Sequence, residues 1–133
     1  TESCMIQENR RIHEIFDGIR GLGIRIAMDD FGTGYSSLGM LKKSPADIVK
    51  IDRTFVRDIL KSRFDATFIR FVVALCHDVD IKVCLEGVEC EEEFDCVRPM
   101  RLDYIQGFFF GRPVAADIFG RDFLSSATAT PAS

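Results

Sequence analysis

Helical and extended patterns alternate along the 133 residues of the chain, and this alternation restricts the fold more than any other feature of the sequence. Four short segments have the residue pattern of strands, at 24–29, 48–52, 81–86 and 104–106. A helical pattern over residues 6–22 precedes the first of them, and a further helical pattern follows each one. Strands that alternate with helices pair in parallel, so we expect an α/β protein of four parallel strand-helix units, in an open sheet or in a barrel.

The polar residues of each predicted strand lie on one face. Because successive side chains of a strand point to opposite sides, Lys50 and Asp52 share a face, opposite Val49 and Ile51. The other strands repeat this division, with polar or small residues at Arg25, Ala27, Asp29, Lys82, Cys84, Glu86 and Gln106. An open sheet covered by helices on both sides is apolar on both faces, whereas a barrel has a polar rim that holds the active site. The pattern therefore favours a barrel.

Three acidic residues stand near the ends of two predicted strands. Asp29 and Asp30 are adjacent, and Glu86 closes the third strand. Carboxylates suit Mg²⁺ or Mn²⁺, and two such ions about 3.5–4 Å apart can clamp a phosphate and activate a water. Lys50 could hold that water, and Gln106 completes the polar set. Taken singly, these residues fit ion pairs that tie strand ends together, but their convergence on one rim favours a metal site.

Two other features have more than one interpretation from the sequence alone. The turn Gly32-Thr33-Gly34 fits a role in backbone geometry, which is the commoner use of such glycines, or in cradling a phosphate. The run Phe108-Phe109-Phe110 could stack on a base, although core packing is the commoner role of phenylalanine.

Charge, hydropathy and cysteine content exclude several classes of protein. The chain has 17 basic and 21 acidic residues, and no basic cluster suits duplex nucleic acid. No segment approaches the roughly 20 apolar residues of a membrane span, so we expect no membrane contact from these residues. Five cysteines without a Cys-x-x-Cys pair indicate reduced thiols in a cytoplasmic protein, rather than a disulfide framework or a structural zinc site.

Several short segments follow one another along the chain in a characteristic order. They are Asp29-Asp30-Phe31-Gly32-Thr33-Gly34-Tyr35-Ser36-Ser37-Leu38, Lys50-Ile51-Asp52-Arg53, Glu86-Gly87-Val88-Glu89, Gln106-Gly107 and Phe110-Gly111-Arg112-Pro113. In this order they resemble the EAL domain, a family of bacterial cyclic di-GMP phosphodiesterases. The resemblance runs from Thr1 to about Phe119.

The resemblance implies a modified (β/α)₈ barrel that opens cyclic di-GMP to linear pGpG with two divalent ions, Mg²⁺ or Mn²⁺. By matching position, Asp29 would bridge the two metals, and Asp30 and Glu86 would join it in the metal site. Lys50 would hold the catalytic water, and Gln106 would form a hydrogen bond within the site.

The resemblance also implies supporting residues and partners. Glu89 would lie beside the site, and the loop with Gly32, Thr33 and Gly34 would couple metal binding to the formation of a homodimer. Glu2 matches a glutamate that steadies this loop. We also expect other signalling domains in the parent chain, through which a cytoplasmic domain can be anchored to a membrane.

Some family features are missing from these residues. Leu85 stands where the family usually has Ala, which adds bulk beneath the metal site. The Glu-Ala-Leu signature, an Asn ligand and a further Glu ligand precede Thr1 in the family pattern. We therefore expect residues 1–124 to be the C-terminal half of the barrel, inactive by itself, and residues 125–133 to be a flexible tail. A half-barrel has two open strand edges, which invite self-association.

Two alternatives to a phosphodiesterase remain open. One is a catalytically silent module of the same family that binds cyclic di-GMP or a protein partner, which would follow if the natural gene lacks the upstream ligands. The other is a different metal-dependent barrel enzyme, which would explain the carboxylates but not the ordered segments.

Overall fold

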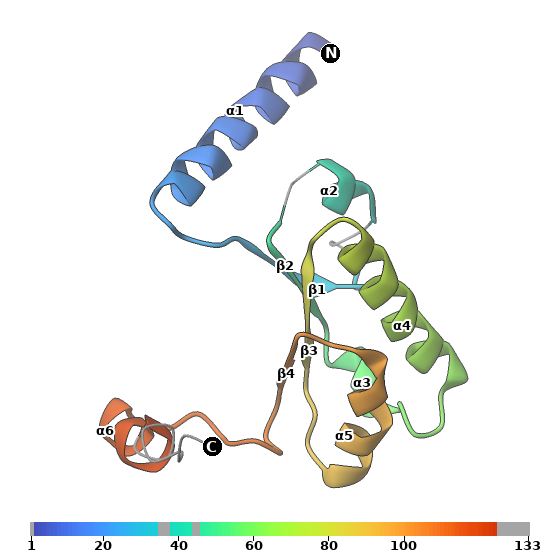
Figure 1. Cartoon of the computed structure of the whole chain (residues 1–133). Helices are drawn as coiled ribbons and strands as arrows, with labels where there is room; N and C mark the ends of the chain where they lie inside the picture. The colour runs from blue at the N-terminus through green and yellow to red at the C-terminus, as the bar shows by residue number, and fades with distance from the viewer. Residues whose placement is uncertain (1, 35–37, 44–45, 125–133) are drawn as a thin grey trace.

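The computed structural model describes residues 2–34, 38–43 and 46–124 of the chain, and it contains one four-stranded parallel sheet (Figure 1). The strands are β1 (Ala27–Phe31), β2 (Ile48–Ile51), β3 (Lys82–Glu86) and β4 (Tyr104–Gln106), in the order β1-β2-β3-β4. The helices are α1 (Glu2–Gly21), α2 (Leu38–Lys43), α3 (Thr54–Arg57), α4 (Arg63–Asp78), α5 (Glu91–Val97) and α6 (Ala116–Phe119). A 3₁₀ turn at Arg98–Met100 follows α5, and a π-helical turn at Gly120–Leu124 follows α6. The predicted class, four parallel strands that alternate with helices, is confirmed.

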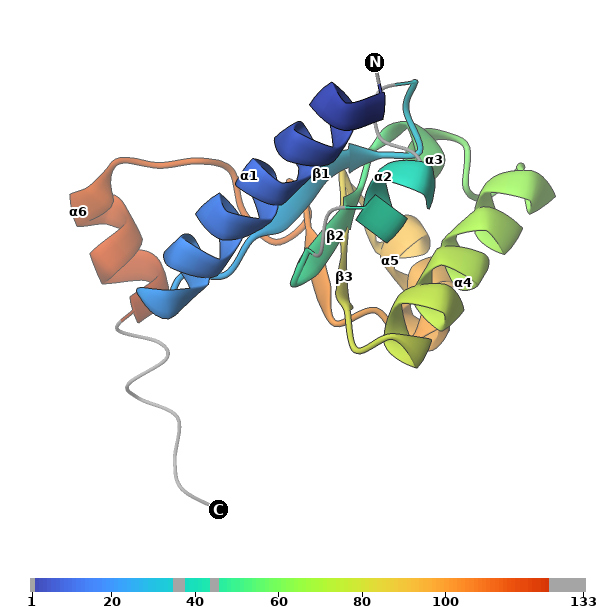
Figure 2. The ribbon, with the colours of Figure 1, turned by 90° about the horizontal axis from the view of Figure 1, so that it is seen from above.

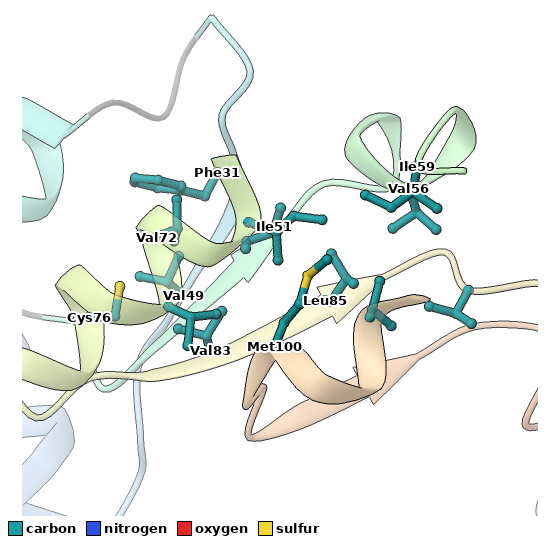
Figure 3. Close-up of a cluster of buried hydrophobic side chains, with 14 residues drawn as sticks. Phe31, Val49, Ile51, Val56, Ile59, Val72, Cys76, Val83, Leu85 and Met100 are labelled. Carbon is teal, nitrogen blue, oxygen red and sulfur yellow. The ribbon is translucent and has the colours of Figure 1, made fainter. Parts of the chain in front are cut away.

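One face of the sheet carries the hydrophobic core. Val49, Ile51, Val83 and Leu85 are fully buried, and they contact Ile69, Val72, Val73 and Cys76 of α4 in one cluster (Figure 3). Helices α3, α4 and α5 lie on this side of the sheet, whereas α1 and α6 lie away from them on the other side (Figures 1 and 2). The alternation of side chains in β2 and β3 therefore divides the sheet as the sequence predicts, with apolar side chains toward the helices.

Helix α4 begins at a well-defined cap. The hydroxyl of Ser62 accepts a hydrogen bond of 3.1 Å from the amide of Asp65, which satisfies one of the free N–H groups of the first turn. The buried residues of the helix follow at spacings of three and four, so one stripe faces the sheet. No helix among the described residues has the length and apolar character to cross a membrane.

The predicted bounds of the first strand are wrong at both ends. The strand was expected over residues 24–29, but its first partnered residue is Ala27, which pairs with Ile48. β2 begins only at Ile48, so earlier residues have no strand to pair with, and the amide of Ile26 donates instead to the carboxylate of Asp47 at 2.7 Å. Ile24, the first residue of the predicted strand, is 54% exposed. At its other end the strand continues to Phe31.

Several other boundaries also differ from the sequence pattern. The first helix begins at Glu2 and ends at Gly21, and the short helix α3 was not predicted. Ser36 and Ser37, which belong to the first of the segments that resemble the EAL domain, lie outside the described residues, as does the proposed tail at 125–133.

Candidate active site

A bulge in β1 places two adjacent aspartates on the same side of the sheet. Met28 pairs with Val49 and Phe31 pairs with Ile51, so Asp29 and Asp30 together stand opposite the single residue Lys50. Such an insertion breaks the normal alternation of side chains. Phe31 returns to the core, where it is 2% exposed, while both aspartates are exposed.

The backbone of the bulge is held by its own polar groups. Asp30 has a φ of 53°, in the left-handed region that aspartate tolerates better than most residues. Its amide donates to Oδ1 of Asp29 at 2.9 Å. Its carbonyl accepts from the hydroxyl of Thr33 at 2.7 Å and from the amide of Thr33 at 3.2 Å. Thr33 therefore supports the aspartate through the backbone.

Steric crowding explains why a glycine occupies the first position of the turn that follows. Gly32 has a φ of 96°, and a Cβ atom there would lie 2.3 Å from the ring of Phe55. Gly34 has open space around it and is exposed. The structure thus gives Gly32 and Thr33 a role in shaping the backbone around Asp30.

Glu86 brings a third carboxylate to the aspartates. It is the last residue of β3, and one oxygen each of Asp29, Asp30 and Glu86 lie within 4.8 Å of one another. Carboxylates at this spacing repel one another, and a hard divalent cation would relieve the repulsion. The donor set, all oxygen and on the polar face of the sheet, fits Mg²⁺ or Mn²⁺.

Lys50 lies among these carboxylates. Its ammonium is 3.8 Å from Oδ1 of Asp29 and forms a closer ion pair with Glu86. The hydrogen bond with Glu86 is the largest influence on its pKa, which is raised above the ordinary value despite partial burial. The side chains of Lys50 and Glu86 are 24% and 21% exposed, so the pair is only partly hydrated. Lys50 is therefore a stable cation beside the candidate metal site.

Gln106 and Glu89 border the same site from the next strand and its loop. Gln106 pairs with Glu86 in the β3–β4 register, and its carbonyl accepts from the amides of Gly87 at 2.8 Å and Val88 at 3.2 Å. Glu89 is exposed, and its amide donates to Oε2 of Glu93 at 2.7 Å. Both residues line a pocket of about 370 Å³ that Asp30 and Glu86 also line.

Glu2 is not brought to this site by anything that the structure describes. It begins α1, but its side chain lies outside the described part of the chain. Leu85, which was expected to add bulk beneath the metals, is fully buried in the core on the face opposite Glu86. Its substitution for Ala therefore concerns core packing.

The pocket also contains Asp52 and Arg53, which the sequence did not single out as functional, and Phe108, from the run that the sequence left open between base stacking and core packing. Hydrogen bonds from the side chain and then the amide of Thr54 lower the pKa of Asp52. Its place on the polar face with Lys50 was the signal that could have found it. Cys84 lies on that face too, but it is 7% exposed, and burial raises the pKa of its thiol.

The chain is similar in sequence to one known protein family. The family model of the EAL domain matches residues 1–113. The cyclic di-GMP phosphodiesterase PdeR of Escherichia coli is 37% identical over 121 residues, which are 91% of this chain and 18% of that protein.

Solved structures show the same likeness. An EAL domain protein from Listeria monocytogenes has a TM-score of 0.75 and 42% identity, over 80% of this chain and 43% of the other. Klebsiella pneumoniae BlrP1 has been solved in complexes of manganese with cyclic di-GMP and of calcium with cyclic di-GMP. Its manganese complex at pH 9.0 is 38% identical with a TM-score of 0.70, over 76% of this chain and 26% of the other.

The chain spans less than half the length of each of these proteins. Its four strand-helix units match part of their TIM-type barrel, which confirms the fold class that the sequence favoured. The aspartate bulge, the glutamate of β3 and the loops that follow them all fall within the segment that the family model covers. On this agreement of sequence and structure, the chain belongs to the EAL domain family.

Proposed function

We propose that this chain contributes an active site that hydrolyses cyclic di-GMP to linear pGpG. The observation that carries the proposal is the convergence of Asp29, Asp30 and Glu86 around Lys50 at the carboxyl ends of β1, β2 and β3. The family resemblance, and the names of relatives such as the Escherichia coli phosphodiesterase PdeR, support cyclic di-GMP as the substrate.

The three carboxylates Asp29, Asp30 and Glu86 would hold two divalent ions, Mg²⁺ or Mn²⁺. Such ions supply Lewis-acid stabilisation of a phosphate and an activated water at neutral pH. The manganese complex of BlrP1 with cyclic di-GMP supports this use of the site. Asp29 and Asp30 would hold the ions in fixed positions, because the bulge fixes both residues.

Lys50 and Gln106 would act on the reacting groups themselves. The ammonium of Lys50 would donate a hydrogen bond to the attacking water and oppose the negative charge that builds on the phosphate. Attack on phosphorus breaks one bond to a ribose 3′ oxygen, which leaves as a hydroxyl and yields a 5′ phosphate. The amide of Gln106, on the wall of the same pocket, would bind a polar group of the site or the substrate.

We further propose that the loop with Gly32, Thr33 and Gly34 links the metal site to a homodimer contact, with Glu2 and Glu89 as supporting residues. The hydrogen bonds from Thr33 to the carbonyl of Asp30 support this link, because a shift of the loop would move the aspartate.

We propose, finally, that these 133 residues do not turn over substrate alone. Two ions with octahedral preference need about twelve ligand positions, and only three carboxylates of the described residues share the site. The sheet also has two edge strands, β1 and β4, so the polar face is open on both sides.

The test is release of pGpG from cyclic di-GMP by the intact protein with Mn²⁺, followed by liquid chromatography. Asp29→Asn should lower turnover by more than about 100-fold, since it removes a metal ligand. Asp95→Asn, at an exposed site on α5, is the matched control and should leave turnover unchanged. Binding of cyclic di-GMP without any hydrolysis would identify a silent binding module and overturn the enzymatic proposal. If the protein neither binds nor hydrolyses cyclic di-GMP, the proposed substrate is wrong.

A further inference from the structure

One hydrogen bond joins the two edges of the sheet across its polar face. The guanidinium of Arg25, two residues before β1, donates to the phenolic oxygen of Tyr104, the first residue of β4, at 3.4 Å. Because β2 and β3 lie between β1 and β4, the two side chains together span both inner strands. This contact therefore links parts of the sheet that share no backbone pairing.

The linked side chains lie directly beneath the candidate active site. Arg25 and Tyr104 line a pocket of about 440 Å³ that Lys50 and Gln106 also line. Cys84 of β3 pairs with Lys50 on one side and with Tyr104 on the other, so the tyrosine stands at the level of the lysine. Gln106 follows two residues later and on the same face of β4. The hydrogen bond thus forms part of the floor on which the catalytic groups stand.

The backbone beside each partner is tied to an inner strand. Next to the arginine, the amide of Ile26 donates to the carboxylate of Asp47, just before β2, at 2.7 Å. Next to the tyrosine, the amide of Asp103 donates to the carbonyl of Val83 in β3 at 3.1 Å. Since both attachment points are anchored, the side-chain bond constrains how strongly the sheet curves over its polar face.

We propose that Arg25 and Tyr104 are positioning residues for hydrolysis of the cyclic dinucleotide, and that their hydrogen bond sets the place of Gln106. The inference rests on the proposed function, because it concerns the geometry of that reaction. The aspartates Asp29 and Asp30 come from one edge strand and Gln106 from the other, so the curvature of the sheet sets their separation. A displacement of about 1 Å in an active site can lower the rate about 100-fold.

The experiment uses the intact protein with Mn²⁺ and measures kcat and KM for release of pGpG, together with the unfolding temperature. Tyr104→Phe removes the hydroxyl but keeps the ring, Arg25→Met keeps an unbranched side chain without the guanidinium, and a double variant combines them. Arg70→Met, at an exposed position on α4, is the matched control. Tyr104→Phe is also made in a Gln106→Leu background, which tests whether the effect passes through that amide.

Positioning predicts that Tyr104→Phe and Arg25→Met each lower kcat by about 5- to 50-fold, with KM within about twofold of the parent. The double variant should lose no more than either single variant, because both remove the same bond. In the Gln106→Leu background, Tyr104→Phe should cost less than about twofold, and Arg70→Met should match the parent.

Several results would overturn the inference and leave the proposed function intact. They are an unchanged kcat in Tyr104→Phe, a loss confined to KM, additive losses in the double variant, and an equal loss with and without Gln106. A fall in kcat that only follows unfolding at the assay temperature would show a role in packing alone and would also overturn it. If the parent protein releases no pGpG, the proposed function is wrong and the inference falls with it.

Discussion

The ammonium of Lys50 on β2 lies 3.8 Å from Oδ1 of Asp29 on β1, so one positive charge already occupies the space between the carboxylates of neighbouring strands. A bound cation and Lys50 must therefore share this space. The arrangement leads to opposite expectations for metal affinity and for turnover when the lysine is removed.

Lys50→Met should lower turnover by about 100- to 1,000-fold, the usual loss when a preorganised electrostatic group is removed from a reaction. Mn²⁺ affinity should stay equal or rise, because a positive charge no longer competes with the ion. Steady-state kinetics and Mn²⁺ titration measure the two effects, with Lys61→Met at an exposed position as control. Turnover near that of the parent would contradict a catalytic role for Lys50.

Removal of bound metal should lower the free energy of unfolding, and addition of Mn²⁺ should restore it. Three carboxylates within 4.8 Å repel one another, so a bound ion would stabilise the folded state, by an amount that grows with the logarithm of the free ion concentration. At an Mn²⁺ concentration about 100 times its dissociation constant, the gain should be about 2.7 kcal/mol per ion, seen as a higher unfolding temperature after chelator is replaced by Mn²⁺. Asp30→Asn should remove most of this gain and Asp95→Asn none of it. Equal gains in the two variants would argue against the site.

Gly87 should resist substitution for a steric reason. Its φ is 88°, and a Cβ atom there would lie 2.3 Å from Cβ of Arg53. Gly87→Ala should lower the free energy of unfolding by about 1–3 kcal/mol, through strain in both backbone and contact. Gly18→Ala, at an exposed position near the C-terminal end of α1 where nothing lies within 4 Å, should instead raise it by about 0.5–1 kcal/mol. Urea denaturation measures both, and equal effects would contradict the geometry.

We expect Asp103 to make an acid-sensitive contribution to stability. It contacts the start of β3, whereas Glu86 lies at the end of that strand. Burial alone would raise the pKa of Asp103, but hydrogen bonds from His77 at 2.7 Å and the Val83 amide at 2.8 Å outweigh burial and lower it. A lowered folded-state pKa means that this contribution is complete above the unfolded value near 3.8 and is lost as the pH falls through the folded value. Asp103→Asn should destabilise the protein at pH 7, and the difference should shrink below pH 3.8. A difference independent of pH would refute the assignment.

Much of the site followed from strand alternation alone. Lys50 and Glu86 each lie on the polar face of a regular strand, and their apolar neighbours Ile51 and Leu85 are buried as the alternation requires. Sequence pattern is reliable there because β2 and β3 pair without interruption.

The position of Asp30 could not be derived in the same way. Strict alternation would send it to the core face, opposite Asp29, and only the bulge and the left-handed backbone bring both to one side. The start of β1 was missed for a related reason, since it depends on where β2 begins to offer a partner. Both features depend on how β1 pairs with β2, and the sequence of one segment alone does not determine that pairing.

Because of the bulge in β1, deletion of a single residue would change the candidate metal site but leave the packing of the core intact. Deleting one of the two aspartates would restore regular pairing, with one acidic residue opposite Lys50 and with Met28 and Phe31 still facing Val49 and Ile51. The core would keep its contacts, while the three carboxylates of the candidate site would become two. On the proposed function, a change of one residue in the length of β1 would therefore remove a metal ligand without rebuilding the fold.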